Sequence, residues 1–305
     1  MKKVYRKQWI EGTSCWGIIQ NGMYFLSPLD IYQDGIISCW KKADLWQFKE
    51  ILEQGWVVPC VANRKSLDIF ELGCFEVEQA EWLNPTTDTY YAYIKSIVQQ
   101  LNPEMENLYR TTPREIEKWN SHRTSFTASS TSFKITQPIG YFCDDGKDCS
   151  IFYRKEGTLY LSILTAYKDG TLEISTDPNV YYSWEEIEAM LQNQTLCVCP
   201  KPNEWVTIEH LGKVLFKHNK NTISQQDKIA TIVELRKDIM NLPTASQSCI
   251  SAYHDYLENP NEYTKETLRK AYEAVPECER CYLGDMDTKD SDYIRILYTN
   301  ETREV

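Results

Sequence analysis

Four aspartates near the end of the chain, Asp285, Asp287, Asp290 and Asp292, lie close enough together to bind a divalent cation. Carboxylate oxygens are the ligands that Ca²⁺ and Mg²⁺ prefer. The spacing departs from a calcium-binding loop, because Lys289 stands at the fifth position and the sixth is not glycine. A solvated turn, in which aspartates bond to the local backbone, explains the same cluster and is favoured. The alternative is a divalent-metal-dependent hydrolase that uses Asp285 and Asp287.

A C-x-x-C pair, Cys278 and Cys281, comes directly before this cluster. Thiolates at this spacing ligate structural zinc or carry out thiol–disulfide exchange. Zinc needs further ligands, and a redox motif lies between a strand and a helix. Here a helix is predicted before the pair and a turn after it. We therefore favour incidental thiols and expect no metal and no cofactor, with a structural zinc protein through Cys278 and Cys281 as the alternative.

No other group of residues forms a catalytic motif. The four histidines show no metal-ligand spacing, and none lies in the sequence context of an activated nucleophile. The glycines are scattered through predicted turns and form no phosphate-binding loop. The interpretation therefore leans toward a protein that is not an enzyme.

Tryptophans are concentrated in the first 82 residues. Trp, Tyr and Arg anchor many protein–protein interfaces. Trp46 lies one position off the apolar stripe of its predicted helix, so we expect an exposed anchor there, although core packing explains most of the set. The interface candidates are Trp46, Asp285 and Asp292.

The overall charge restricts the kind of partner. A formal net charge of −11 argues against nucleic acid and against an anionic membrane surface, because both attract clustered Lys and Arg. It is compatible with a protein partner, including a basic one. The first twelve residues lack the apolar run of a signal peptide, and the 11 cysteines are interpreted as reduced thiols. We expect a cytoplasmic protein.

The elements that position these residues occur twice. GMYFLSPLDIYQDG, residues 22–35, returns as GTLYLSILTAYKDG, residues 157–170, with seven of 14 positions identical. Each copy ends in an Asp-Gly pair, which favours a β-turn between two strands. A predicted helix follows, beginning at Asp44 in the first copy and at Ser183, with Glu186 completing a capping box, in the second. A second hairpin then aligns at an offset of 139 residues.

The repeat predicts an α+β fold with internal duplication. The unit is an antiparallel β-β-α-β-β module, covered on one face by a helix and followed by trailing helices. The expected organisation is a first module (residues 1–120), a Ser/Thr-rich linker (121–135), a second module (136–243) and an acidic helical C-terminal segment (244–305). The sequence YIRILY, residues 293–298, predicts a strand at the end of that segment.

Two stretches resemble an uncharacterised bacterial domain family. They are ILEQGWVVPCV with SLDIFELGCFEV, within residues 51–77, and AYEAVPECERCYLGDMDTKD, residues 271–290. Some members of such families look like neighbours of toxin systems, and the resemblance therefore implies a toxin-neutralising role. It transfers no catalytic residue. The resulting hypothesis is a non-enzymatic, cytosolic protein-binding module, such as an immunity-like inhibitor.

Overall fold

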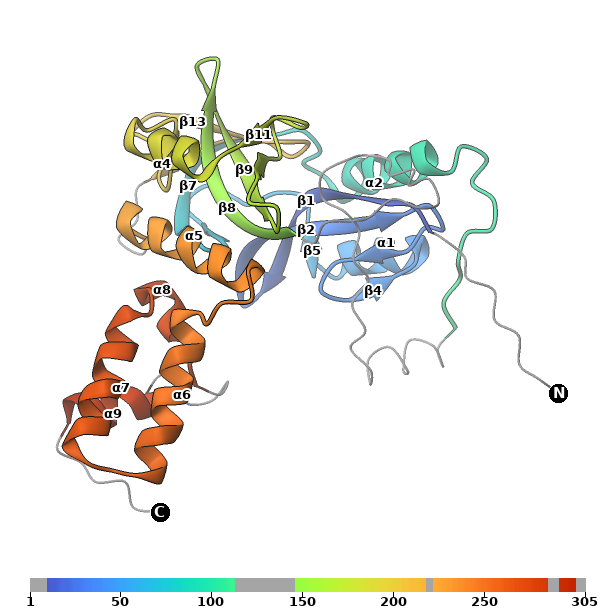
Figure 1. Ribbon diagram of the computed structural model, residues 1–305. Helices are drawn as coiled ribbons and strands as arrows, with labels where there is room; N and C mark the ends of the chain where they lie inside the picture. The colour runs from blue at the N-terminus through green and yellow to red at the C-terminus, as the bar shows by residue number, and fades with distance from the viewer. Residues whose placement is uncertain (1–9, 113–145, 218–221, 285–290, 300–305) are drawn as a thin grey trace.

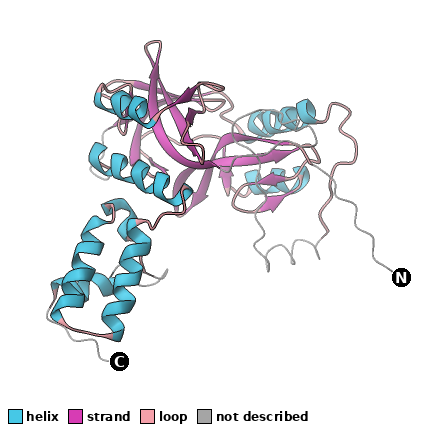
Figure 2. Cartoon of the chain, viewed as in Figure 1, coloured by secondary structure: helices cyan, strands magenta, loops and turns pink. Residues whose placement is uncertain are grey.

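The chain folds into one large mixed sheet with helices packed against it, followed by a helical bundle (Figures 1 and 2). The structure is a computed structural model and describes residues 10–112, 146–217, 222–284 and 291–299. The predicted α+β class is confirmed. The predicted linker, residues 121–135, lies outside the described residues.

The first half begins with a long hairpin and ends in a helix. The turn of the hairpin is at Gly22, where φ is 76°, a conformation that glycine adopts without steric cost. Its elements are β1 (Gly12–Asn21), β2 (Met23–Tyr32), β3 (Ile37–Ser38), β4 (Lys42–Ala43), α1 (Leu45–Glu53), β5 (Val57–Val58), β6 (Ser66–Ile69), β7 (Gly73–Trp82) and α2 (Thr87–Leu101).

The second half has the same order of elements. They are β8 (Gly146–Lys155), β9 (Thr158–Tyr167), β10 (Leu172–Ile174), β11 (Tyr181–Tyr182), α4 (Trp184–Gln192), β12 (Leu196–Cys197), β13 (Trp205–Ile208), β14 (Gly212–Lys217) and α5 (Gln225–Ile239). Both Asp-Gly pairs lie in turns between antiparallel strands, β2 with β3 and β9 with β10. Ser183 and Glu186 form the predicted capping box at the start of α4.

The two halves also share strand register. Leu26 of β2 lies opposite Ile69 of β6, and the equivalent Leu161 of β9 lies opposite Ile208 of β13. Both pairings are parallel, so the prediction of a wholly antiparallel sheet is wrong at these two places. The reason is the helix between the two hairpins, which carries the chain back to the end of the sheet from which it started.

Residues with a left-handed backbone recur at equivalent positions. The pairs are Gly22 and Gly157, Gly35 and Gly170, Trp40 and Asn179, Gly55 and Gln194, Arg64 and Asn203, Glu71 and His210, and Gly73 and Gly212. This conformation is uncommon outside glycine. The shared positions therefore show that the backbone follows the same path in both halves, even where the side chains differ.

The halves join edge to edge and share a core. β7 runs antiparallel to β14, with Val77 opposite Phe216. Behind this junction the ring of Phe75 lies 5.7 Å from that of Phe152 and 5.3 Å from that of Phe216. On the flanks α1 packs beside α2, which contacts β2, while α5 contacts β8 and β9. The result is one continuous, curled sheet (Figure 1).

Each half also contacts the trailing helix of the other. The turn between β6 and β7 reaches α5, where Lys228 Nζ lies 3.1 Å from Glu71 Oε2. The equivalent turn between β13 and β14 reaches α2, where the His210 ring stacks on Tyr93 at 6.1 Å. These reciprocal contacts hold the two halves in a fixed arrangement.

The C-terminal segment is a separate bundle with its own core, formed by α6 (Ala245–Glu258), α7 (Glu262–Ala274), α8 (Glu277–Arg280) and α9 (Ser291–Tyr298). The longest helices of this segment are α6 and α7. The predicted terminal strand is wrong, because residues 293–298 belong to α9. Tyr293 and Leu297, four residues apart, are both buried against the bundle, which is helical rather than strand periodicity.

Candidate functional site

The aspartate candidates for metal binding are only partly described. Asp285, Asp287 and Asp290 lie outside the described residues. Asp292 lies in the first turn of α9, where its carboxylate accepts a hydrogen bond of 2.8 Å from Arg295 and one of 3.4 Å from the Tyr253 hydroxyl. Both oxygens of the Asp292 carboxylate therefore accept hydrogen bonds from side chains of the bundle.

The C-x-x-C pair lies at α8. Cys278 is within the helix, and Cys281 follows it with an exposed side chain. In the ranges that the structure describes, no group of three or more His, Cys, Asp or Glu side chains has the arrangement of a metal site.

Trp46 lies in the first turn of α1, with 40% of its surface accessible. The Arg110 guanidinium carbon lies 3.8 Å from the centroid of its ring. This cation–π contact occupies one face of the indole. Only part of the Trp46 ring is therefore free to contact a partner.

A second aromatic group was not singled out from the sequence. We define the Trp40 cluster as Phe25, Trp40, Lys41 and Trp56. The Trp40 ring lies 5.2 Å from Phe25 and 6.5 Å from Trp56, and Lys41 Nζ lies 3.7 Å above the Trp56 ring. The Trp40 indole N–H donates to Ser27 Oγ at 2.9 Å, which fixes the ring although 53% of the residue is exposed.

The backbone of Trp40 is unusual for a bulky residue. Its φ is 61°, in the left-handed region, and Asn179 holds the equivalent position with φ 66°. Asparagine tolerates this conformation well, whereas a large side chain there is strained, at a cost of about 1–3 kcal/mol. The first half therefore retains a strained, exposed tryptophan where the second half has the residue that suits the backbone.

The same contrast extends over the first half. Four of its large exposed apolar side chains have polar equivalents in the second half: Met23 and Thr158, Trp40 and Asn179, Trp46 and Glu185, and Phe70 and Glu209. The second half exposes Val180 and Tyr181 instead, where the first half has Lys41 and Lys42. The two halves thus have the same backbone path but expose different side chains. Aligning the two copies for this contrast would have indicated Trp40 from the sequence.

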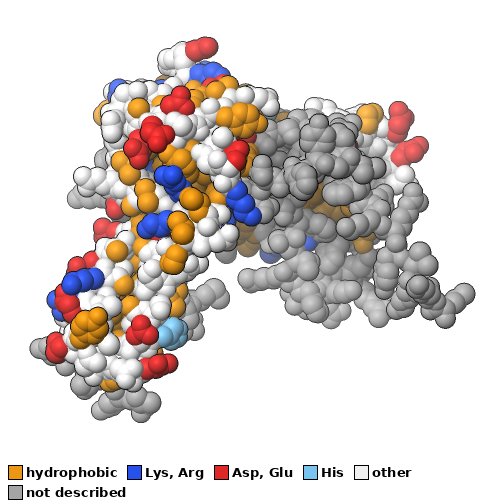
Figure 3. Space-filling model, in the orientation of Figure 1, with side chains coloured by type: hydrophobic (Ala, Val, Ile, Leu, Met, Phe, Trp, Pro, Cys, Tyr) orange, Lys and Arg blue, Asp and Glu red, His pale blue; other side chains and the backbone are white. Residues whose placement is uncertain are grey.

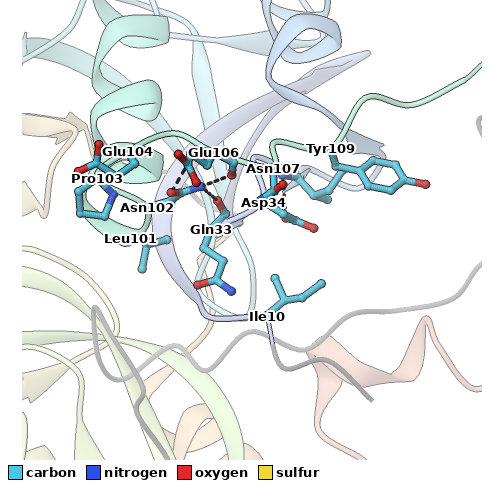
Figure 4. A pocket seen from close by; sticks show the side chains of 11 residues that line it. Ile10, Gln33, Asp34, Leu101, Asn102, Pro103, Glu104, Glu106, Asn107 and Tyr109 are labelled. Carbon is cyan, nitrogen blue, oxygen red and sulfur yellow. Dashed lines mark hydrogen bonds between the residues drawn. The ribbon is translucent and has the colours of Figure 1, made fainter. Parts of the chain in front are cut away.

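A polar cavity of about 780 Å³ lies between the turn after β2 and the loop after α2 (Figure 4). The Asn102 amide N–H group donates to the Gln33 carbonyl at 3.0 Å and to the Glu106 carbonyl at 2.8 Å. Burial raises the pKa of the Asp34 carboxyl, which shares the cavity with Glu104 and Glu106. None of the described residues that line it is basic, so the cavity is acidic.

A second cavity of about 460 Å³ lies where the sheet meets the C-terminal bundle. Its carboxylates come from both parts, Asp68 and Glu71 from the sheet and Glu279 from α8.

On the face formed by the second half and the bundle, Lys and Arg are interspersed with acidic and apolar side chains (Figure 3).

The chain belongs to a family of domains of unknown function, DUF7638. The family's model matches residues 1–105 and 141–241, which correspond to the two halves of the sheet. The C-terminal bundle falls within residues 244–304, which match a second domain of unknown function, DUF7639. Comparison with curated proteins and with solved structures gave no match. The prediction of an uncharacterised domain family is confirmed.

Among the described helices, none has the length and apolar character needed to cross a membrane.

Proposed function

We propose that this protein is a non-enzymatic binding protein that recognises a protein partner through the Trp40 cluster. The observation that carries the proposal is Trp40 itself, a bulky residue in a left-handed conformation with 53% of its surface exposed. Strain of this kind persists only where the surrounding structure holds the residue in place, and it is concentrated at functional sites. Asn179 shows that the relaxed alternative fits this backbone.

The chemistry of the cluster suits a protein surface. Tryptophan is enriched among residues that dominate interface energies, because a rigid ring buries a large area at low entropic cost. Hydrogen bonding to Ser27 and ring packing on Phe25 fix Trp40 before binding. A fixed anchor loses little side-chain entropy on association.

We further propose that the partner is basic and that its binding inhibits it, as an immunity-type protein would. A net charge of −11 attracts a positively charged protein over several ångströms and speeds association. If the partner is an enzyme, its activity with and without this protein distinguishes an inhibitor from a neutral binder. We place this activity in the cytoplasm.

We also infer that the two halves are copies of one β-β-α-β-β module. Their equal registers and their shared left-handed positions support this inference. The second copy then serves as a scaffold for the shared core, and the first copy carries the binding surface.

The test is affinity capture from a lysate of the source organism under reducing conditions, with three forms of the tagged full chain. Wild type and Tyr181→Ala, which removes an aromatic side chain exposed to 60% in the second half, should retain one basic partner at near-equal amounts. Trp40→Asn should lose it. A partner retained by Trp40→Asn, or no partner retained by the wild type, would contradict the proposal.

A further inference from the structure

The cavity of about 460 Å³ lies at the junction between the sheet and the C-terminal bundle. The turn around β6 contributes Asp68, Phe70 and Glu71, α5 contributes Thr231, and the bundle contributes Ser246, Glu279 and Tyr282. Figure 1 shows α8, which carries Glu279, at the end of the bundle that approaches α5. Carboxylates of the sheet and of the bundle therefore line the same partly open cavity.

The cation in this junction is already engaged. Lys228 of α5 is completely buried, and its Nζ lies 3.1 Å from Glu71 Oε2. Glu234, also on α5, is nearly buried and accepts a hydrogen bond from Lys237 Nζ at 2.6 Å and another from the Ala245 N–H at the start of α6. The two ion pairs, Lys228 with Glu71 and Lys237 with Glu234, lie within the sheet and α5, and neither includes the Glu279 carboxylate.

The other groups around Glu279 act in two directions. Asp68 and Glu71 from the sheet, and Glu234 from α5, bring negative charge, whereas Lys228 brings positive charge. Ser246 of α6 hydrogen-bonds the Glu279 carboxyl. Arg280, next to Glu279, is turned into the bundle, where its Nε donates to the Val275 carbonyl at 3.0 Å. Like charges facing each other in a partly buried space repel more strongly than in water.

We propose that ionisation of Glu279 weakens the docking of the C-terminal bundle on the sheet, so that the junction acts as an acid-strengthened hinge. With Glu279 neutral, the junction holds two ion pairs and a hydrogen-bonded carboxyl group. With Glu279 ionised, an additional negative charge faces Glu71 and Glu234. The bundle is then held less tightly. The proposal does not depend on partner binding at the Trp40 cluster.

The direction with pH follows from the surroundings of the carboxyl. Burial, and then the charges of Glu71 and Glu234, raise the pKa of Glu279 above its ordinary value of 4.5. A group whose pKa is raised in the docked state stabilises docking fully below its ordinary pKa and loses that contribution as the pH rises through the docked pKa. Burial also raises the pKa of Asp68 in the same cavity. Ionisation of Asp68 as the pH rises should therefore weaken docking as well.

The experiment is single-molecule energy transfer on the full chain between pH 5 and pH 8. Fluorophores are attached through unnatural amino acids at Tyr181 in the second half and at Tyr263 in α7, which is 80% exposed. In the wild type the ratio of docked to undocked molecules should fall as the pH rises, by at most tenfold per pH unit for one proton. Glu279→Gln, which is neutral at every pH, should stay docked at pH 8.

The matched control is Glu277→Gln, because Glu277 is exposed on the same short helix. It should respond to pH as the wild type does. The proposal is wrong if the wild type shows one pH-independent distribution. It is also wrong if Glu279→Gln keeps the full pH response of the wild type, since another group would then control the hinge.

Discussion

Lys228 has the most demanding environment of the described charged residues, because its side chain is completely buried and its cation depends on Glu71 in a turn of the other half. A buried pair of this kind adds little net stability, yet the loss of one partner leaves an uncompensated charge in a low-dielectric interior. The Glu71 side chain retains 21% of its accessibility. The two partners should therefore respond differently to substitution.

We expect Glu71→Gln to lower the free energy of unfolding by about 2–4 kcal/mol, because Lys228 then lacks its counter-charge. Lys228→Met should cost clearly less, since Glu71 can reach water from its turn. Urea denaturation of both variants measures the two losses. Equal losses would show that the buried lysine is not the sensitive partner.

Asp44 is a further residue whose ionised form stabilises the fold. It is the N-cap of α1 and accepts hydrogen bonds from the Gln47 N–H at 2.9 Å and from the Thr111 N–H and hydroxyl at 2.8 and 2.7 Å. Burial acts to raise the pKa of Asp44, but these hydrogen bonds outweigh it and lower that pKa below its ordinary value of 3.8. The resulting stability is present above pH 3.8 and is lost as the pH falls through the lowered pKa.

We therefore expect Asp44→Ala to lower the free energy of unfolding at pH 7 by about 2 kcal/mol, the upper range for the loss of an N-cap. The difference from the wild type should shrink below pH 3.8, where the wild-type carboxyl becomes protonated. Thermal denaturation between pH 2 and pH 7 measures this. A difference that stays constant across the range would assign the effect to packing instead of charge.

At the scale of elements, the junction of β7 and β14 determines how the halves combine. Gly212 lies on this junction opposite Trp82, with φ 142°. A Cβ atom there would lie 2.2 Å from the Glu81 carbonyl oxygen, which belongs to the rigid backbone of β7. Only glycine allows the two strands to pair at this distance.

Gly212→Ala should therefore destabilise the protein by about 2–4 kcal/mol, through both backbone strain and the steric clash. The control is Gly170→Ala, because Gly170 also has a positive φ, 89°, but no atom lies within 4 Å of its Cβ position. Its loss should be about 1–2 kcal/mol from strain alone. Denaturant unfolding compares the two, and similar losses would mean that the clash relaxes without cost.

Several elements were predictable because their signals are local. The Asp34-Gly35 turn, the Ser183 cap and the stripes of α1 and α4 follow from neighbouring residues. The parallel pairing of β2 with β6 was not predictable, since it depends on where a helix returns the chain. The strand predicted at residues 293–298 was wrong because the bundle buries Tyr293 and Leu297 on one helical face. The Trp40 cluster was missed because its members come together only in the fold.

At the scale of the whole molecule, one curled sheet supports two different surfaces and a helical bundle. Phe75, Phe152 and Phe216 unite the halves in a common core, so neither half moves independently of the other. The Trp40 cluster lies in the first half, whereas the acidic hinge lies between the sheet and the bundle. Binding and hinge motion can therefore be separated by substitutions.

Trp40→Asn should leave the fold intact. It relieves the strain of a bulky left-handed residue, about 1–3 kcal/mol, but loses the ring contacts with Phe25 and Trp56 and the hydrogen bond to Ser27. These effects oppose each other, so the free energy of unfolding should stay within about 1 kcal/mol of the wild type. Chemical denaturation measures it. A larger loss would give Trp40 a structural role and weaken the case for a binding role.

The most direct test of the central claim is a calorimetric titration of the captured partner into wild type, Trp40→Asn and Tyr181→Ala. If Trp40 anchors the interface, its replacement should raise Kd by about 30-fold or more, which corresponds to about 2 kcal/mol. Tyr181→Ala should bind as the wild type does. A Kd that is unchanged in Trp40→Asn would contradict the account, because the strained, exposed tryptophan would then have no part in binding.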